Sequence, residues 1–268
     1  MRIVALIAAY NERRFIRPCL EHLKAQGIEA YLIDNESTDN TTELARKYLG
    51  QGLIAIESIP RPGGNYSWRP ILERKEVLAT ELEADWFIHL DPDEIRLPPR
   101  GFATLHDAIV QIDSDGYNAV NFIEYAFVPT RESPNHDHPD FQRTMRWYYP
   151  YLTGDVQQLK AWRRQPQRVN LAESGGHQVR FFELRMYPVS FPMRHYLFLS
   201  IEHAREKYIE RIYEPKEVER GWHRARAALC EDKIWLQSQE ELKYYISDAY
   251  LDSSIPLDRH PLFSGRNG

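Results

Sequence analysis

The 268-residue sequence contains only two cysteines, which argues against a fold held together by disulfides. Cys19 and Cys230 lie far apart and in no spacing typical of a metal site, so a reducing compartment, the cytoplasm, is expected. Long apolar runs are also missing. No segment approaches the roughly eighteen uninterrupted apolar residues of a transmembrane helix. The short apolar N-terminus runs directly into charged residues and predicts a buried strand rather than a signal peptide.

A surplus of basic residues is absent as well. The chain has 34 Lys and Arg against 39 Asp and Glu, a formal net charge of −5, which argues against a nucleic-acid partner. With 43% hydrophobic and 27% charged residues, it has the composition of a globular protein with a sizeable core. Since it has no internal repeat, its length fits one large domain or a core domain with an appendage.

What the sequence does contain is an alternation of strand-like and helix-like segments over about its first hundred residues. Apolar runs predict four buried parallel strands, at residues 3–9, 30–33, 53–59 and 86–90. Amphipathic segments between them predict helices. One has a capping-box pattern at Asn40 and Glu43, and another starts near Pro70. This alternation is typical of an α/β fold with a mainly parallel sheet.

Beyond residue 100 the pattern is less regular. Residues 102–112 predict a helix, residues 117–128 a long strand, and the polar, proline-rich residues 130–176 predict loops. The remainder has helical periodicity. We therefore expect a core over residues 1–200, divided at about residue 100, and a helical C-terminal extension over residues 201–268. The surplus apolar surface of the extension predicts docking on the core and a homodimer contact.

The strongest chemical signal is Asp91-Pro92-Asp93-Glu94, directly after the fourth predicted strand. Three carboxylates in four positions repel one another unless a cation is present, and oxygen ligands suit Mg²⁺ or Mn²⁺. Such an ion would bridge a diphosphate and stabilise negative charge on a departing nucleotide. A solvated acidic loop is the alternative. The carboxyl end of a strand in an open α/β sheet favours the functional interpretation, because such sheets bind ligands there.

A second polar segment, Asp34-Asn35-Glu36-Ser37-Thr38-Asp39, leaves the second predicted strand at the same edge. A carboxylate at this position can accept hydrogen bonds from a base or a ribose. Taken alone, the segment is better explained as a polar turn that caps the next helix.

Together, three segments resemble the ordered landmarks of family 2 glycosyltransferases. They are Ala8-Ala9-Tyr10-Asn11-Glu12, Asp34-Asn35-x-Ser37-Thr38-Asp39 and Asp91-Pro92-Asp93-Glu94. The resemblance covers residues 1–100 and extends more loosely to Arg194-His195-Tyr196 and the segment from Ser200 to Lys207. Residues 1–100 would form the nucleotide-sugar-binding half of the core, and residues 101–200 the acceptor and metal half. It implies a GT-A (Rossmann-like) fold, a UDP- or GDP-sugar donor, a divalent metal and inversion at the anomeric carbon.

The resemblance also implies roles for single residues. It assigns to the nucleotide pocket Ala9, Tyr10, Glu12, Asp34 and Asn35, with Asp34 on the base. Asp91 would face the ribose or the metal, and Asp93 would be the principal metal ligand. His195 would be a second metal ligand or a diphosphate contact, since neutral imidazole binds metals. A hydrogen-bonded histidine at a strand end explains His195 equally well.

An inverting transferase also needs a general base, normally a carboxylate, that takes the proton of the acceptor hydroxyl. The Glu-Asp pair common in the family is missing from the expected region. Glu173, in Glu173-Ser174-Gly175-Gly176-His177, is the leading candidate because the glycines permit close approach of a substrate. His177 and Asp155 are the alternatives.

Basic residues are candidates for binding the diphosphate. Arg74 and Lys75 lie on the helix before the acidic turn, and Lys160 begins a basic group that continues with Arg163, Arg164 and Arg168. Any one of them alone is better explained as a solvated surface cation, but the group as a whole favours diphosphate binding, because the expected donor carries two phosphates. The segment 135–140 is rich in His and Asp but matches no zinc spacing, and predicts a surface or acceptor contact. Aromatic residues at 147–151 and 162 would either stack on sugars or pack the core.

The sequence thus predicts a glycosyltransferase that moves a sugar to an acceptor hydroxyl of a glycan or small molecule. By analogy with the family, the pathway would be bacterial surface polysaccharide or glycan biosynthesis. Two rivals remain. A nucleotidyltransferase would carry a glycine-rich loop after the first strand, where this chain has Ala9-Tyr10-Asn11-Glu12. A non-catalytic nucleotide-sugar-binding protein of the same fold would explain the missing Glu-Asp pair.

Overall fold

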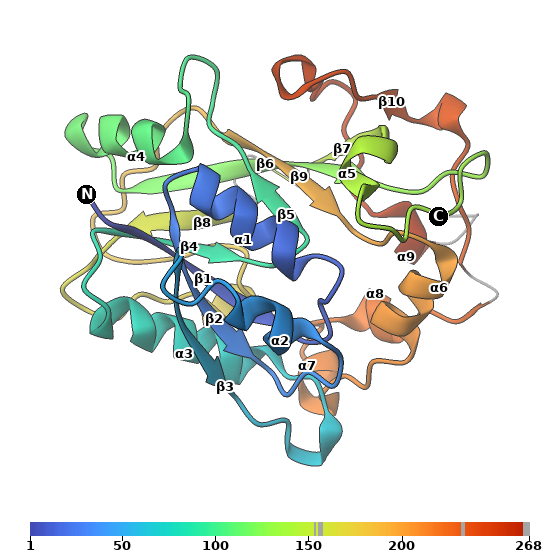
Figure 1. Ribbon diagram of the computed structural model, residues 1–268, viewed down its shortest axis with the longest axis horizontal. Helices are drawn as coiled ribbons and strands as arrows, with labels where there is room; N and C mark the ends of the chain where they lie inside the picture. Colours follow the sequence, from blue (N-terminus) through green and yellow to red (C-terminus); the bar gives the residue numbers. More distant parts are fainter. Residues whose placement is uncertain (153, 155–157, 232–233, 265–268) are drawn as a thin grey trace. The chain divides into compact units, whose positions relative to one another are not determined.

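The computed structural model describes residues 1–152, 154, 158–231 and 234–264 (Figure 1). The chain forms two compact units, each built from three separate stretches of sequence. The first unit comprises Met1–Arg61, Trp68–Phe122 and Val156–Met193. The second unit comprises Pro62–Ser67, Ile123–Asp155 and Arg194–Gly268.

The first unit is built on a mainly parallel sheet. Its strands β1 (Ile3–Ala9), β2 (Glu29–Asp34), β3 (Leu53–Ser58) and β4 (Trp86–Leu90) lie in the order β4-β1-β2-β3. All three neighbouring pairs are parallel, and β8 (Gln158–Arg163) adds to β4 in the antiparallel direction. The predicted α/β fold is confirmed.

Helices cover both faces of this sheet. Successive residues of the apolar strand β1 point to opposite sides, so both faces carry apolar side chains that have to be buried. Four helices flank it, α1 (Ile16–Ala25), α2 (Thr41–Arg46), α3 (Trp68–Glu81) and α4 (Leu105–Ser114). Ile3, Ala5 and Ile7 pack with the apolar residues of α1 and α4, whereas Val4 and Leu6 pack with those of α3. Each fully buried aliphatic side chain contributes about 1.5–3 kcal/mol.

Some local predictions were wrong. Asn40 makes no side-chain cap bond at α2; Asp39 Oδ1 instead accepts from the backbone N–H of Thr41, at 2.9 Å. The predicted loop region 130–176 contains β7 (Trp147–Tyr151) and β8. The prolines of this region led to the prediction of loops. Pro150 sits inside β7, where its carbonyl still accepts from the N–H of Leu257, at 2.9 Å.

In the second unit, antiparallel pairing dominates. β6 (Ala119–Phe127) and β9 (Phe191–Tyr196) both continue from the first unit into the second. β7 pairs with β6 and with the short β10 (Lys243–Tyr244). Two large side chains predicted to stack on sugars or pack the core, Tyr148 and Tyr149, are buried here, and Trp162 is buried in the first unit. All three therefore pack the core.

Among the described residues beyond 200, the expected helical pattern is present only in short segments. They are α6 (Ile201–Ala204), a π-helical turn (Arg205–Ile209), α7 (Pro215–Glu219), α8 (Arg224–Ala227), α9 (Pro261–Ser264) and two 3₁₀ turns, Gln239–Glu241 and Asp248–Tyr250. α5 (Phe141–Thr144) is equally short. A longer helix is interrupted at Gly221 and His223, whose φ angles of 95° and 56° are left-handed.

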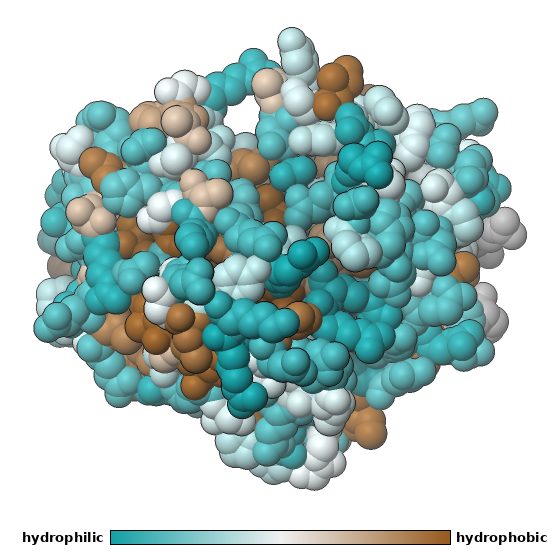
Figure 2. All heavy atoms as spheres, viewed as in Figure 1, coloured by the Kyte–Doolittle hydropathy of each residue, from teal (hydrophilic) through white to brown (hydrophobic). Residues whose placement is uncertain are grey.

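Within the described part of the chain, no helix has the length and apolarity needed to cross a membrane. Figure 2 shows a face on which hydrophilic side chains predominate and apolar ones form small separate areas. Several large apolar side chains of the second unit are nevertheless exposed, namely Ile212, Tyr244, Ile246, Tyr250 and Ile255. The homodimer contact stays a prediction.

Candidate active site

Three strand ends of the first unit meet at one edge of its sheet. Register pairs Ala9 at the end of β1 with Asp34 at the end of β2, and Ile7 with Leu90 at the end of β4. Parallel strands carry their carboxyl ends to the same edge, so the segments that follow β1, β2 and β4 are neighbours there. This is the edge at which open α/β sheets bind ligands.

Asp34 is a buried carboxylate with unused hydrogen-bonding capacity. Its Oδ2 accepts from the N–H of Ser37 at 3.1 Å, while Oδ1 is buried without a partner among the described residues. In Asn35, Nδ2 donates to the carbonyl of Ile59 at 3.0 Å, and Oδ1 is likewise buried without such a partner. An unsatisfied buried acceptor costs about 1–3 kcal/mol, so these oxygens are suited to the N–H groups of a ligand.

The loop after β1 is fastened to the turn after β2. The backbone N–H of Asn11 donates to Ser37 Oγ at 3.0 Å, and Asn11 Oδ1 accepts from the N–H of Thr38 at 2.8 Å. The N–H of Glu12 donates to Thr41 Oγ1 at 2.8 Å. Asn11 adopts a φ of 57°, which asparagine tolerates better than most residues. Hydrogen bonds therefore join the first two sequence landmarks to each other.

Two arginines beside the loop after β1 and the turn after β2 were not predicted from the sequence. The guanidinium of Arg61 lies 3.7 Å from the centroid of the Tyr10 ring, and the Arg61 N–H donates to Glu36 at 2.9 Å. Arg46 lines a surface pocket together with Asp34, Thr42, Leu49, Ile56 and Ser58. Arg61 follows β3 and Arg46 ends α2. A search for basic residues at these strand and helix ends would have identified both from the sequence.

The acidic turn is only partly available for a metal. Glu94, in the short strand β5 (Glu94–Arg96), is 2% exposed, and its carboxylate accepts from Arg96 Nη2 at 2.6 Å and Lys160 Nζ at 2.9 Å. Two buried cations therefore neutralise Glu94, which is not among the predicted metal ligands. Asp91 and Asp93 remain as candidate ligands.

Asp91 and Asp93 are suited to a divalent metal ion that binds together with a nucleotide. Mg²⁺ and Mn²⁺ prefer oxygen ligands, and Mg²⁺ in particular is usually held by one or two carboxylates, substrate phosphates and water. Across the residues that the structure describes, no three His, Cys, Asp or Glu side chains form a group able to hold an ion. The predicted metal ligands Asp91, Asp93 and His195 stay a prediction. The two aspartates belong to the first unit and His195 to the second.

Lys75 of α3 is fully buried against β4. Its Nζ lies 2.8 Å from His89 Nδ1 and donates to the carbonyl of Leu90 at 3.2 Å. Burial lowers the pKa of Lys75 to about 8, although the charge of Asp91 acts in the opposite direction. Burial also holds the pKa of His89 well below its usual value, so His89 is neutral and its Nδ1 accepts. Lys75 thus places a cation behind the acidic turn.

The other predicted diphosphate contacts are engaged elsewhere. Arg74 forms ion pairs with Glu57 and Glu81, both at 2.8 Å, and Lys160 is buried on Glu94. The arginines after Lys160 bind separate partners: Asp113 for Arg163, the carbonyl of Thr80 for Arg164 and Glu76 for Arg168. The group does not converge: Lys160 and Arg163 lie on β8, whereas Arg164 and Arg168 follow it, and each binds a separate acceptor. A diphosphate role for Arg74 and Lys160 gains no support.

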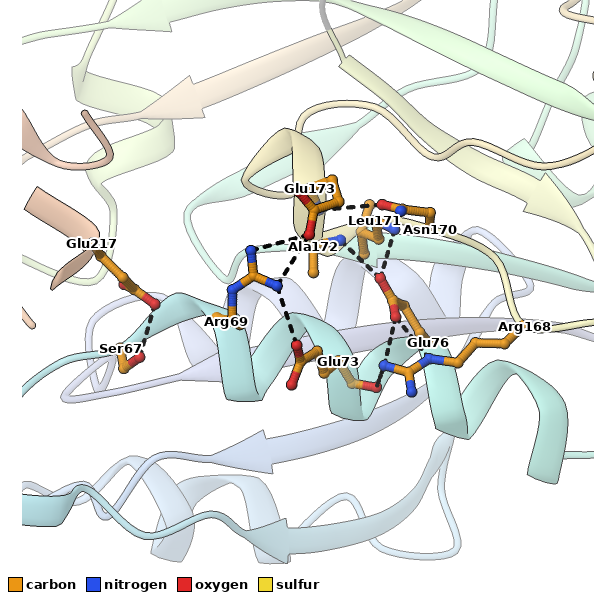
Figure 3. A network of polar contacts seen from close by, with 10 residues as sticks. All are labelled: Ser67, Arg69, Glu73, Glu76, Arg168, Asn170, Leu171, Ala172, Glu173 and Glu217. Carbon is orange, nitrogen blue, oxygen red and sulfur yellow. Dashed lines mark hydrogen bonds and ion pairs between the residues drawn. The ribbon is translucent and has the colours of Figure 1, made fainter. Parts of the chain in front are cut away.

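Two of the three candidate general bases, Glu173 and His177, lie in the segment around the 3₁₀ turn η2 (Ala172–Ser174). Glu173 is 59% exposed at its side chain, and its Oε1 accepts from both Nη1 and Nη2 of Arg69 at 3.1 Å (Figure 3). His177 is exposed and meets the Trp68 ring edge-on, with centroids 6.3 Å apart. Asp155 lies outside the described residues.

A buried glutamate of α3 holds this segment. Glu76 Oε1 accepts from the N–H groups of Leu171 and Ala172 at 2.7 and 2.8 Å, and Oε2 accepts from Arg168 at 2.7 Å (Figure 3). This contact could not be predicted from the sequence, since a glutamate in an amphipathic helix is usually solvated.

Gly176 explains why glycine occurs in this segment. Its φ is +83°, and a Cβ there would lie 3.0 Å from both His89 Nε2 and Leu72 Cδ2. Packing onto His89, rather than close approach of a substrate, therefore accounts for this glycine. The assignment of Glu173 as general base stays a prediction.

Two histidine-containing features lie in the second unit. His195, on β9, has its Nδ1 2.6 Å from Oε1 of the buried Glu124 on β6. In the segment 135–140, Thr144 Oγ1 lies 2.9 Å from His136 Nδ1 and 3.2 Å from His138 Nε2. Those two rings therefore share a hydroxyl group, as a structural rather than a metal-binding arrangement.

Comparisons with known proteins agree with part of these observations. Residues 4–64 match the family model described as Glycosyl transferase family 2; this segment includes the first two landmarks but not the acidic turn. No curated protein matches the sequence.

Several solved structures are similar at low identity. One is S. aureus TarS 1-349 in complex with UDP, with a TM-score of 0.48, 15% identity and coverage of 74% of this chain and 61% of that chain. Another is the mannosyltransferase PcManGT from Pyrobaculum calidifontis in complex with GDP-Man and Mn²⁺, with a TM-score of 0.44, 16% identity and coverage of 82% and 67%. A longer TarS structure gives a TM-score of 0.43 at 14% identity over 78% of this chain, which spans only 39% of that protein.

Proposed function

We propose that this protein is a GT-A-type glycosyltransferase that moves a sugar from a nucleotide-diphospho-sugar to an acceptor hydroxyl, with inversion and with Mn²⁺ or Mg²⁺ bound. The main support is the arrangement of Tyr10, Asp34 and Asp91, which follow or end three neighbouring parallel strands at one sheet edge. The match of residues 4–64 to Glycosyl transferase family 2 agrees with it.

Asp34 would bind the base of the donor. Its buried Oδ1 needs a donor, and both uracil and guanine carry a ring N–H that can supply one. The hydrogen bonds of Asn11 and Glu12 to the turn after β2 would keep this carboxylate in place. Because either base satisfies Asp34, both UDP- and GDP-sugars are candidate donors.

Asp91 and Asp93 would hold the divalent ion, which when bound stabilises charge on the diphosphate. The neighbouring Glu94 has a different role: its two ion pairs with Arg96 and Lys160 fix the end of the turn. The buried Lys75 adds positive charge on the β4 side of the turn.

In the proposed reaction the acceptor oxygen bonds to the anomeric carbon as the bond to the diphosphate oxygen breaks. A general base removes the proton of the acceptor hydroxyl. If Glu173 is that base, we expect its ion pair with Arg69 to open, so that the carboxylate is free to turn toward the acceptor hydroxyl. His177 is the alternative in the same segment.

The acceptor and the setting are proposed from the sequence. We infer a glycan precursor of a bacterial surface polysaccharide as the acceptor, and a cytoplasmic location from the low cysteine content.

A panel of UDP- and GDP-sugars tests the proposal, with release of UDP or GDP measured with and without Mn²⁺. We expect Mn²⁺-dependent release with at least one donor, and a loss of about 100-fold or more in Asp93→Asn, since charge stabilisation of this kind is worth about 10²–10³ in rate. Asp115→Asn is the control, an exposed carboxylate at the end of α4 in the same unit.

Other outcomes are equally informative. Binding of a nucleotide sugar without any release would identify a non-catalytic binding protein. Failure of every UDP and GDP compound to bind would refute the proposal.

A further inference from the structure

The surface pocket that Arg46 lines lies entirely within the first unit, where α2 meets the ends of β2 and β3 (Figure 1). Register pairs Asp34, the last residue of β2, with Ser58, the last residue of β3. Ile56 lies two positions before Ser58 and therefore on the same face of its strand. On α2, Thr42 and Arg46 are four residues apart and share one face of the helix. The pocket thus combines a strand end that carries a carboxylate with a helix face that carries a guanidinium.

The size and chemistry of this pocket suit an aromatic ring with polar edges. Its volume is about 360 Å³, within the range of pockets that bind small molecules, and Leu49 and Ile56 supply apolar surface. Asp34 is 5% exposed, and its Oδ1 is buried without a partner among the described residues. Arg46 is exposed, and its guanidinium forms no ion pair with any residue that the structure describes. One pocket therefore offers a ligand both a negative acceptor and a positive donor.

Guanine and uracil present different groups to such a pair. In guanine, the ring N1–H and the 2-amino group are adjacent donors, and O6 and N7 are adjacent acceptors. In uracil, the single N–H of the base lies between two carbonyl oxygens. A carboxylate can accept from both guanine donors, whereas at uracil its second oxygen would face a carbonyl. A guanidinium can donate to O6 and N7 together, which is the contact that arginine makes most often when proteins read guanine in DNA.

The position of the pocket also fits the rest of a nucleotide sugar. β1 lies between β2 and β4, so the strand ends that carry Asp34 and Asp91 are separated by two strand spacings, about 10 Å. This distance leaves room for a ribose between a base at Asp34 and a diphosphate at Asp91 and Asp93.

We propose that this pocket holds the base of the donor nucleotide, that Asp34 and Arg46 together select guanine over uracil, and hence that the donor is a GDP-sugar. Arg46 is then a specificity-determining residue, which acts on the base and not on the reacting atoms. This inference rests on the proposed function and narrows the donor class that Asp34 alone leaves open.

Calorimetric titration with GDP and with UDP, each in the presence of Mn²⁺, tests the selection. We expect the wild type to bind GDP about 10–100-fold more tightly than UDP, the discrimination typical of one bidentate contact to a base. Arg46→Ala should lose this factor with GDP and change little with UDP. Arg46→Lys keeps the charge but not the planar fork, so it should lose most of the factor as well.

The contact itself is tested with 7-deaza-GDP, in which a C–H group replaces N7. The wild type should bind this compound about 10-fold more weakly than GDP, because one hydrogen bond to a charged group is lost. Arg46→Ala should bind the two compounds equally. A structural role of Arg46, or an effect of its charge alone, would not produce this difference, since both ligands have the same charge and nearly the same shape.

The matched control is Lys47→Ala. Lys47 is an exposed cation next to Arg46 in the sequence but is not among the residues that line the pocket. Both nucleotide affinities of this variant should equal those of the wild type. Equal losses in Lys47→Ala and Arg46→Ala would reveal an effect of net charge and overturn the specific role of Arg46.

The outcomes separate the inference from the proposed function. Three results would each overturn the selection of guanine while leaving the glycosyltransferase intact: UDP binding to the wild type as tightly as GDP, 7-deaza-GDP binding to it as tightly as GDP, or equal losses of GDP and UDP affinity in a folded Arg46→Ala variant. Failure of every UDP and GDP compound to bind would overturn the proposed function together with this inference. Circular dichroism of each variant separates misfolding from loss of the base contact.

Discussion

At the scale of single residues, Asp34 offers the most direct test of the nucleotide site. Asp34→Asn removes the negative charge of a carboxylate whose buried Oδ1 has no partner among the described residues. A hydrogen bond to a charged group is worth about 1.5–3 kcal/mol, so we expect UDP or GDP to bind about 10–100-fold more weakly. Calorimetric titration with each nucleotide measures this change.

The control for Asp34 is the exposed Asp115→Asn variant. Equal affinity of Asp34→Asn and wild type would mean that the base binds elsewhere. Thermal unfolding of the nucleotide-free variant shows whether the turn after β2 stays intact.

Lys75 predicts a pH dependence of stability. Its pKa is lowered from 10.5 to about 8 in the folded protein, so between these values the unfolded chain binds more protons than the folded one. The free energy of unfolding contributed by Lys75 therefore rises as pH increases from about 8 to about 10.5. Relative to Lys75→Met, we expect the wild type to become more stable by about 2–3 kcal/mol over this window, measured by urea unfolding. A constant difference between the two proteins would show that Lys75 titrates normally.

At the scale of elements, Glu76 attaches the segment around η2 to α3. Glu76→Gln keeps the size of the side chain but cannot accept from two backbone N–H groups and Arg168 with both oxygens. We expect a loss of about 2 kcal/mol in the free energy of unfolding. Hydrogen exchange at the amides of Leu171 and Ala172 should accelerate in the same variant.

The matched control is Glu73→Gln, on the same helix. Glu73 is 44% exposed at its side chain and pairs with Arg69, so its loss should cost less than about 0.5 kcal/mol. Equal destabilisation by the two substitutions would show that the buried carboxylate of Glu76 has no special role.

Elements differ in how far the sequence predicts them. The parallel strands of the first unit were predicted closely, because a strand covered on both faces is a continuous apolar run that few other structures produce. β7 and β8 were missed, since the composition around them is polar and rich in proline. The short C-terminal helices were overestimated, because apolar periodicity does not reveal a left-handed residue such as His223.

The residues of the candidate site also differ in how far the sequence predicts them. Asp34, Asp91 and Asp93 could be placed at one edge because strand ends are readable from the sequence. The partners of Glu94, Lys75 and Glu76 could not be predicted. Each of these side chains pairs with a residue distant in sequence, and the sequence does not show whether an ionisable side chain is buried.

At the scale of the whole molecule, a bound nucleotide and metal should stabilise the folded state. A ligand at 100 times its Kd adds about 2.7 kcal/mol, which corresponds to a rise in Tm of about 5–10 °C for a chain of this size. We expect this rise with Mn²⁺ and the correct nucleotide, its reversal by EDTA, and a reduced shift in Asp93→Asn. A rise that survives EDTA would indicate binding that does not need the ion.

The interleaving of the two units has a practical consequence. The polypeptide passes from one unit to the other at five points, after residues 61, 67, 122, 155 and 193, so neither unit is a continuous stretch of sequence. Shortening the gene at any single position would leave one or both units without a strand or loop. Dissection of this protein therefore calls for point substitutions in the intact chain, and a fragment that lacks activity would say nothing about which unit carries it.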